Sequence, residues 1–173
     1  MILSTDLQKI KVLIFDVDGT LTDGRAAYLD GGEEIKFFDH HDMHWLKMAV
    51  RAGLTVGTLS AADSPANKRV PEMLNLSFAI IGAKDKLAAF EEILHKFNVS
   101  AAECLYMGDD IVDMPVLKRA GIGVAVADAV EELDEVIQWR TNAPGGRGAA
   151  KEVITRVLKE KGLFDSIMER YRR

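Results

Sequence analysis

A short apolar run that ends in two aspartates is the feature that most constrains what this chain can fold into. Residues 12–15 are all apolar, which is long enough for one buried strand, and Asp16 and Asp18 follow with Gly19 directly behind them. Because side chains alternate along an extended chain, both carboxylates leave the strand on the same side. Gly19 permits a sharp turn at this point. The pattern predicts a buried strand that presents two carboxylates at its carboxyl end.

Two carboxylates this close repel each other, and one would take up a proton unless a cation lay between them. Carboxylate oxygens are hard ligands that suit Mg²⁺, so the pair indicates a metal site. The alternative is a plain aspartate-rich turn that caps a helix. A calcium loop of EF-hand type is excluded, because counting from Asp16 puts Ala27 where the bidentate glutamate belongs.

The size and charge of the chain limit its class. It has 173 residues, of which 48% are hydrophobic and 28% charged, so we expect one globular domain spanning residues 1–173. The net charge of −5 argues against a nucleic-acid partner, since binding phosphates needs a basic surface. No apolar run approaches the length of a membrane span, so no membrane partner is expected. Cys104 is the only cysteine and cannot form an intrachain disulfide, which favours the cytoplasm.

Strand and helix patterns alternate along the rest of the chain. Further strands are predicted at residues 54–59, 78–81, 105–107, 124–126 and 136–139. Helices are predicted from Asp42 to a stop at Gly53, from Pro65 onward, and at residues 85–97, 112–120 and 149–161. This alternation implies an α/β fold, a doubly wound and mainly parallel sheet with helices on both faces.

Residues 25–38 depart from this alternation. The turn signal Asp30-Gly31-Gly32 lies between two short apolar segments, which predicts a β-hairpin that projects from the domain. Two roles for the hairpin stay open, an oligomer contact and an ordinary surface flap.

Polar side chains gather at the carboxyl ends of three predicted strands, where doubly wound sheets bind their ligands. They are Asp16, Asp18, Ser60, Asp109 and Asp110. Asp113, one turn into the following helix, shares a face with Asp109 and Asp110, although capping of that helix would also explain it. Four or five carboxylates in one pocket need a divalent cation, which strengthens the metal hypothesis.

Such a set of residues suits phosphate-ester hydrolysis. A carboxylate can attack phosphorus to form an aspartyl-phosphate, which water then hydrolyses. A carboxyl group two residues on can protonate the leaving alcohol and then activate that water. The charge on the phosphoryl oxygens needs a metal, a hydroxyl or amide donor and a lysine. Ser60 and Lys86 are the candidates, although Lys86 taken alone would be an ordinary solvated helix residue.

Four segments resemble, in their order, the four motifs of the haloacid dehalogenase-like phosphohydrolases. They are Asp16-Val17-Asp18-Gly19-Thr20, Ser60, Lys86 and Gly108-Asp109-Asp110-x-x-Asp113. The resemblance implies that Asp16 is the nucleophile and a Mg²⁺ ligand. It implies that Asp18 is the general acid and base and binds the metal through its backbone carbonyl.

The same resemblance assigns the remaining motif residues. Ser60 and Lys86 would hold the phosphoryl group, and Asp109 would complete the metal site. Asp110 or Asp113 would support it. Many members carry a cap domain after the first or second motif, but the gaps from Asp18 to Ser60 and from Ser60 to Lys86 are too short for one. We therefore expect a capless enzyme.

A closer resemblance covers nearly the whole chain. The hairpin and three segments are similar to the 3-deoxy-manno-octulosonate 8-phosphate phosphatases. The segments are Phe38-x-x-x-Asp42, Lys84-Asp85-Lys86-Leu87 and Gly145-Gly146-Arg147-Gly148. That family is tetrameric and hydrolyses a sugar-acid phosphate on the way to lipopolysaccharide, and near relatives act on nine-carbon sugar-acid 9-phosphates. The resemblance implies a homotetramer in which Asp42 and Arg147 bind substrate, Arg147 from the adjacent subunit, although Arg147 taken alone would be an ordinary solvated loop residue.

The chain departs from the pattern of that family at two places. Asp42-Met43-His44-Trp45 stands where Asp-Gly-x-Gly is usual, which adds bulk beside the expected substrate mouth. Ala61-Ala62 stands where Gly-Arg is usual, which removes a possible contact to a carboxylate or phosphate.

We therefore expect a capless, Mg²⁺-dependent phosphomonoesterase acting on a 2-keto-3-deoxy sugar-acid phosphate, first of all the eight-carbon 8-phosphate. A nine-carbon 9-phosphate is the alternative substrate. The alternatives that are not enzymes are a scaffold domain and a receiver domain of response-regulator type, although receivers lack the sequence Asp-x-Asp-Gly-Thr.

Overall fold

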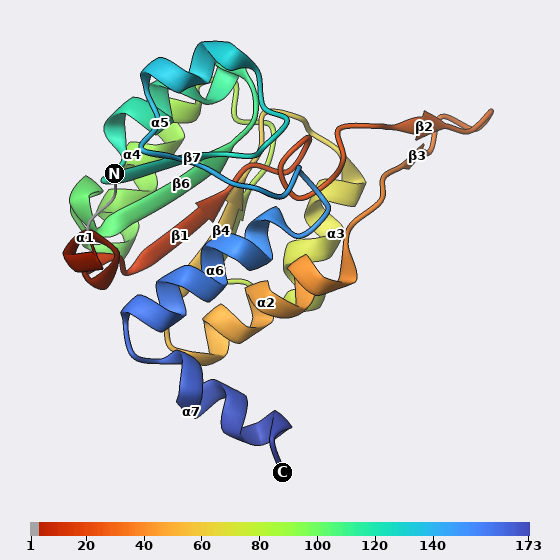
Figure 1. Cartoon of the computed structure of the whole chain (residues 1–173). Coiled ribbons are helices and arrows are strands. Elements are labelled where there is room, and N and C mark those ends of the chain that lie inside the picture. Colours follow the sequence, from red (N-terminus) through yellow and green to blue (C-terminus); the bar gives the residue numbers. More distant parts are fainter. Residues whose placement is uncertain (1–3) are drawn as a thin grey trace.

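The computed structural model describes residues 4–173, so residues 1–3 of the expected domain lie outside the described part. An open sheet of six parallel strands forms its centre, in the order β5-β4-β1-β6-β7-β8 (Figure 1). The strands are β1 (Val12–Phe15), β4 (Thr55–Leu59), β5 (Phe78–Ile80), β6 (Cys104–Gly108), β7 (Ile122–Ala125) and β8 (Trp139–Arg140). The predicted doubly wound α/β fold is confirmed.

Helices cover both faces of this sheet. They are α1 (Ser4–Lys9), α2 (His40–Arg51), α3 (Pro65–Leu74), α4 (Lys86–Phe97), α5 (Met114–Arg119), α6 (Ala149–Glu160) and α7 (Phe164–Met168). Short 3₁₀ turns are η1 (Ala101–Glu103), η2 (Ile111–Asp113), η3 (Glu131–Glu135) and η4 (Glu169–Tyr171). Because side chains alternate along β1, Leu13 and Phe15 pack with α1, α2, α3 and α6, whereas Val12 and Ile14 pack with α4 and α5.

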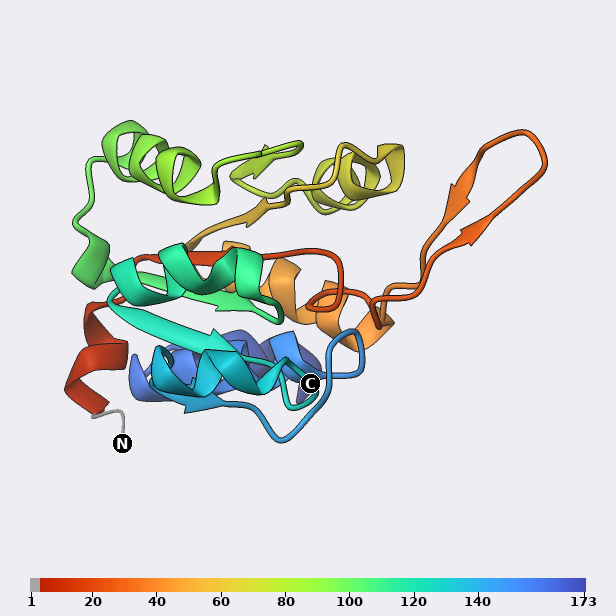
Figure 2. The same cartoon turned by 90° about the horizontal axis from the view of Figure 1, so that it is seen from above.

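A hairpin extends away from the body of the protein, as predicted (Figure 2). Its strands β2 (Ala27–Tyr28) and β3 (Glu34–Ile35) pair antiparallel. Tyr28 and Phe37 are 72% and 68% exposed on it, so the hairpin presents apolar surface.

The segments of the chain between the predicted motifs contain only the hairpin and the helices and strands of the α/β domain. Between Asp18 and Ser60 lie the hairpin, α2 and β4, and between Ser60 and Lys86 lie α3 and β5. The part of the chain that the structure describes therefore has no separate cap domain, which confirms that prediction. No helix within residues 4–173 is long and apolar enough to cross a membrane.

Strand β7 begins at Ile122, two residues before its predicted start, and three other predicted boundaries were wrong for identifiable local reasons. Helix α2 begins at His40 rather than Asp42, because the Asp39 side chain accepts hydrogen bonds from the first amides. The helix expected over residues 112–120 is divided into η2 and α5, and Asp110 caps the first of these turns. The last strand, β8, is Trp139–Arg140 and not residues 136–139, because η3 brings the chain back to the sheet only there.

The order of the strands reverses at β1. From β1 the sheet continues through β4 to β5 on one side and through β6 to β8 on the other. The loops after β1, β4 and β6 consequently diverge at one edge, which is where open α/β sheets bind ligands.

Candidate active site

A cleft of about 170 Å³ opens at the carboxyl ends of β1, β4 and β6. It is lined by Asp16, Asp18, Ser60, Ala61, Ala62, Lys86, Asp109, Asp110 and Val112. The structure thus brings together all the residues to which sequence analysis gave catalytic, phosphate-binding or metal-binding roles.

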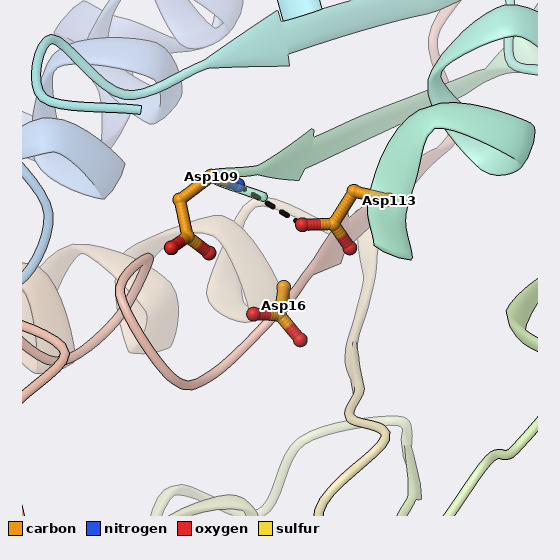
Figure 3. A group of neighbouring side chains, drawn as sticks. All are labelled: Asp16, Asp109 and Asp113. Carbon is orange, nitrogen blue, oxygen red and sulfur yellow. Dashed lines mark hydrogen bonds between the residues drawn. The ribbon is translucent and has the colours of Figure 1, made fainter. Parts of the chain in front are cut away.

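Three carboxylates form an acidic group beside this cleft. Asp16, Asp109 and Asp113 each have an oxygen within 4.8 Å of the others, and Figure 3 shows the side chains pointing toward one another. Two glycines make this approach possible. A Cβ on Gly19 would lie 2.0 Å from Oδ2 of Asp109, and a Cβ on Gly108 would lie 2.4 Å from Oδ2 of Asp113. No larger residue fits at either position without displacing a carboxylate.

Lys86 and Asp113 form the buried floor of the site. Lys86 Nζ lies 2.6 Å from Oδ1 of Asp16 and 2.6 Å from Oδ1 of Asp113. The Tyr106 hydroxyl also donates to Oδ1 of Asp113, at 2.5 Å. The other Asp113 oxygen accepts from the backbone N–H groups of Asp109 and Asp110, at 3.0 and 3.2 Å. Asp113 therefore holds Lys86 and the turn after β6 in place.

The site carries more negative than positive charge. Burial raises the pKa of Asp16 well above its usual value, and the Asp113 carboxylate raises it further. Burial, and next the charge of Asp113, raise the pKa of Asp109 to about 7. Burial alone would lower the pKa of Lys86, but the charges of Asp16 and Asp113 outweigh it, so this pKa is raised. One lysine does not compensate three carboxylates.

A divalent cation fits this donor set. Oδ1 of Asp109 accepts only from the Thr20 hydroxyl, at 3.2 Å, and Asp16 keeps an oxygen that Lys86 does not contact. Carboxylate oxygens are the ligands that Mg²⁺ takes, and a bound cation would offset the burial and the carboxylate repulsion that raise the pKa values of Asp16 and Asp109. Asp113 is less suited to coordinate, since both its oxygens already accept hydrogen bonds.

The Asp18 carboxylate turns away from the acidic group toward two residues that sequence analysis missed. Oδ1 of Asp18 lies 2.6 Å from Lys36 Nζ, and Oδ2 accepts from Asn67 Nδ2 at 2.9 Å. Asn67 also donates to the Ser60 hydroxyl, at 3.0 Å. A signal for Asn67 was present in the sequence, because it shares the buried face of α3 with Val70 and Leu74 and breaks its apolar pattern.

Asp42 and Arg147 do not line the cleft. Asp42 is buried, and its oxygens accept from the backbone N–H groups of Gly148 and Lys151 at 2.9 and 2.7 Å, which fixes the start of α6 to α2. Burial raises the pKa of Asp42 despite these bonds. Arg147 is exposed, lies 3.6 Å from Asp23, and borders a separate hollow of about 560 Å³ along α6. Their roles in substrate binding stay predictions.

Of the remaining predicted residues, Asp110 lines the cleft, and its negative charge adds to the raised pKa of Asp109, whereas Met43 and Trp45 lie away from the cleft. Asp110 is exposed, and its Oδ1 accepts from the backbone N–H of Ile111 at 2.7 Å. Trp45 stacks on Phe164 of α7, with ring centroids 6.0 Å apart, and neither it nor Met43 lines the cleft. The expected bulk beside the substrate mouth is thus not at the cleft.

The chain is similar to a family of hydrolases and, over most of its length, to named phosphatases. The haloacid dehalogenase-like hydrolase family, Hydrolase_3, matches residues 74–152. The 3-deoxy-D-manno-octulosonate 8-phosphate phosphatase KdsC of Salmonella typhi is 33% identical over 161 residues, covering 93% of this chain and 86% of the relative. KdsC of Haemophilus influenzae is 35% identical over 163 residues, with 92% and 91% covered.

Two solved structures are also similar over most of the chain. One is the phosphatase of the same name from Moraxella catarrhalis in complex with a magnesium ion, a phosphate ion and a KDO molecule, with TM-score 0.94, 30% identity and 97% of each chain covered. The other is the cobalt-bound Haemophilus influenzae phosphatase, with TM-score 0.88, 34% identity and 92% and 93% covered. Both relatives contain a divalent metal.

Proposed function

Because this chain belongs to the haloacid dehalogenase-like phosphatases, among the relatives of 3-deoxy-D-manno-octulosonate 8-phosphate phosphatase, we propose that it hydrolyses that ester. The observation that carries the proposed chemistry is the single small cleft that Asp16 shares with Asp18, Ser60, Lys86 and Asp109. The choice of ester is supported by the similarity to phosphatases of that name over nine tenths of the chain.

In the first half of the reaction an Asp16 oxygen attacks phosphorus and the bond from phosphorus to the sugar oxygen breaks. Asp18, in its protonated form, gives its proton to the departing oxygen. In the second half Asp18 takes a proton from water while the water oxygen attacks the same phosphorus. The bond from phosphorus to Asp16 then breaks, inorganic phosphate leaves, and both aspartates regain their starting states.

The other residues of the cleft compensate the negative charge of the phosphoryl group. The Ser60 hydroxyl and the Lys86 ammonium donate to the phosphoryl oxygens. The carboxylates of Asp16 and Asp109 and the backbone carbonyl of Asp18 would hold Mg²⁺. When bound, this ion would neutralise charge on the carboxylates and on the phosphoryl group. Asp113 keeps Lys86 and the turn after β6 aligned, and Asp110 stands beside them.

We further propose that residues 1–173 act as one domain and assemble as a homotetramer. The projecting hairpin supports assembly, because Tyr28, Leu29, Ile35 and Phe37 are exposed on it. Arg147 lies outside the cleft of its own chain. To bind substrate, it would therefore have to reach the cleft of a neighbouring subunit in the assembly.

A nine-carbon 2-keto-3-deoxy sugar-acid 9-phosphate is the second candidate substrate. It is favoured by Ala61 and Ala62, which are both exposed and border the cleft with very small side chains. Space at this wall would accept one more carbon of the substrate.

The test is phosphate release, with Mg²⁺, from a panel of phosphate esters. The panel contains the eight-carbon and nine-carbon keto-acid phosphates, hexose phosphates and an aryl phosphate. We expect the highest kcat/KM for the eight-carbon ester. A preference for the nine-carbon ester would select the second candidate, and equal low rates on all esters would contradict both.

A further inference from the structure

We propose that Asn67 and Lys36 are positioning residues of this enzyme: together they orient the Asp18 carboxylate, and Asn67 makes the Ser60 hydroxyl a donor toward the cleft. The inference rests on the proposed function and adds two residues to it. Neither residue lines the cleft. Both act through a neighbour that does.

Asn67 is a fully buried amide with its hydrogen-bonding groups all satisfied by functional neighbours. Its Nδ2 donates to Asp18 Oδ2 at 2.9 Å and to Ser60 Oγ at 3.0 Å. Its Oδ1 accepts from Lys36 Nζ at 3.0 Å. A carboxylate only accepts and an ammonium only donates, so the amide has one possible orientation. A buried amide is unfavourable unless it is paired, and here two of its three partners, Asp18 and Ser60, line the cleft.

The contact with Ser60 determines what that hydroxyl can do. Ser60 Oγ accepts from Asn67 and also from the backbone N–H of Ala62, at 3.2 Å. A hydroxyl has two acceptor positions and one donor, so only its O–H is left for a ligand. Among residues 4–173, the O–H has one acceptor within hydrogen-bonding reach, the Ala62 carbonyl at a long 3.4 Å. Phosphoryl oxygens accept only, so Asn67 gives Ser60 the polarity that the substrate needs.

The contacts with Asp18 fix its carboxylate from two sides. Lys36 Nζ lies 2.6 Å from Oδ1, and Asn67 Nδ2 lies 2.9 Å from Oδ2. The Lys36 side chain is only 3% exposed, and Glu34 Oε2 holds it from a third direction at 3.3 Å. Asp18 still has 36% of its side chain exposed, so it can reach a ligand in the cleft. Proton transfer demands this combination of a fixed direction and an accessible oxygen.

The test compares Asn67→Leu with Val70→Ala. Leucine has the branched shape of asparagine and suits the apolar face of α3, so this variant removes the three hydrogen bonds with little change of shape. Val70→Ala loosens the same helix face without touching Asp18 or Ser60, and serves as the control for a merely structural effect.

Two substrates separate positioning from stability. A sugar-acid phosphate leaves as an alkoxide and needs a proton, whereas 4-nitrophenyl phosphate leaves as a stable phenolate and does not. Asn67→Leu should lower kcat/KM, which reports the first half of the reaction, by about 10–100-fold on the sugar-acid phosphate and several-fold less on the aryl phosphate, since general acid catalysis contributes about 10²–10⁴-fold. Val70→Ala should leave the ratio of the two rates unchanged. An unchanged ratio in Asn67→Leu would overturn the Asp18 part of the proposal.

Binding of inorganic phosphate, measured by calorimetry with Mg²⁺, tests the Ser60 part without turnover. Asn67→Leu should weaken it by about 10–150-fold, the loss of one hydrogen bond to a charged group, and Val70→Ala should not change it. Equal affinity in wild type and Asn67→Leu would overturn this part. Wild-type protein that binds phosphate but hydrolyses neither ester would contradict the proposed function instead, and the binding comparison would still decide the role of Asn67.

Discussion

Replacing Gly19 by alanine is the most specific perturbation that the site offers. Gly19 follows the aspartate pair at φ +85°, and an added Cβ would lie 2.0 Å from Oδ2 of Asp109 and 2.5 Å from its Cγ. Ordinary van der Waals contact needs roughly 3.4 Å, so the Asp109 carboxylate must move by more than about 1 Å. Such a shift takes a proposed metal ligand out of place.

Two effects of Gly19→Ala can be given magnitudes. The left-handed backbone angle costs an alanine about 1–2 kcal/mol, which should lower the free energy of unfolding. Displacement of Asp109 should weaken metal binding by about 10–100-fold or more, since even disturbed supporting groups of metal sites cost that much. The assay is the rate of phosphate release as a function of Mg²⁺ concentration, together with thermal unfolding.

Gly53→Ala is the matched control. Gly53 has φ +86°, almost the same as Gly19, but nothing lies within 4 Å of its added Cβ. Both variants should therefore lose the stability that the backbone angle costs, Gly19→Ala losing more because its Cβ overlaps Asp109, and only Gly19→Ala should need more Mg²⁺. If the Mg²⁺ dependence of Gly19→Ala equalled that of Gly53→Ala, the role given to Asp109 would be refuted.

Three further outcomes follow from the buried charges. Lys86→Met should lower the free energy of unfolding of the metal-free protein by about 3–5 kcal/mol, because Asp16 and Asp113 lose their shared buried cation. Urea titration measures this free energy, and a change below about 1 kcal/mol would contradict the stabilising role of Lys86 between the two carboxylates. The pKa of Asp109 is raised from 3.8 to about 7, so its contribution to stability is present below about pH 4 and is lost as the pH rises to about 7. Metal-free protein should thus unfold at a lower temperature at pH 7.5 than at pH 5, and Mg²⁺ should reverse this difference; equal unfolding temperatures with and without Mg²⁺ at pH 7.5 would oppose it. Asp42→Asn should cost about 1–2 kcal/mol by weakening the cap of α6, and an accompanying rise of KM would show that Asp42 also serves the substrate.

Local patterns in the sequence were sufficient for most of the architecture. The apolar run before Asp16, the stripe of α4 and the Ser64-Pro65 start of α3 depend on neighbouring residues, and each element formed close to the predicted place. Three of the predicted boundaries that were wrong depended on a cap or a 3₁₀ turn, where a single side chain decides the outcome.

Residues that work through distant contacts could not be found in this way. Lys36 reaches Asn67 across 31 positions, and Asn67 reaches Asp18 across 49. In the sequence Lys36 is one more charged residue of a hairpin, and Asn67 stands out only as a polar residue on the apolar face of α3, which gives it no role. Only the fold, which brings Asn67 and Lys36 to the Asp18 carboxylate after β1, gives either of them a function. The close approach of Gly145 to the first motif is also visible only in the structure, where an added Cβ would lie 1.7 Å from the Gly19 carbonyl oxygen.

The most direct test of this account is to look for the covalent intermediate on Asp16. The full chain is mixed with 3-deoxy-D-manno-octulosonate 8-phosphate and Mg²⁺, quenched in acid during the first turnover, and mapped by mass spectrometry. We predict a phosphoryl group on Asp16, and neither a phosphoryl group nor turnover in Asp16→Asn, which should remain folded. Turnover without phosphorylated Asp16, or a phosphoryl group on another aspartate such as Asp109, would contradict the proposed mechanism.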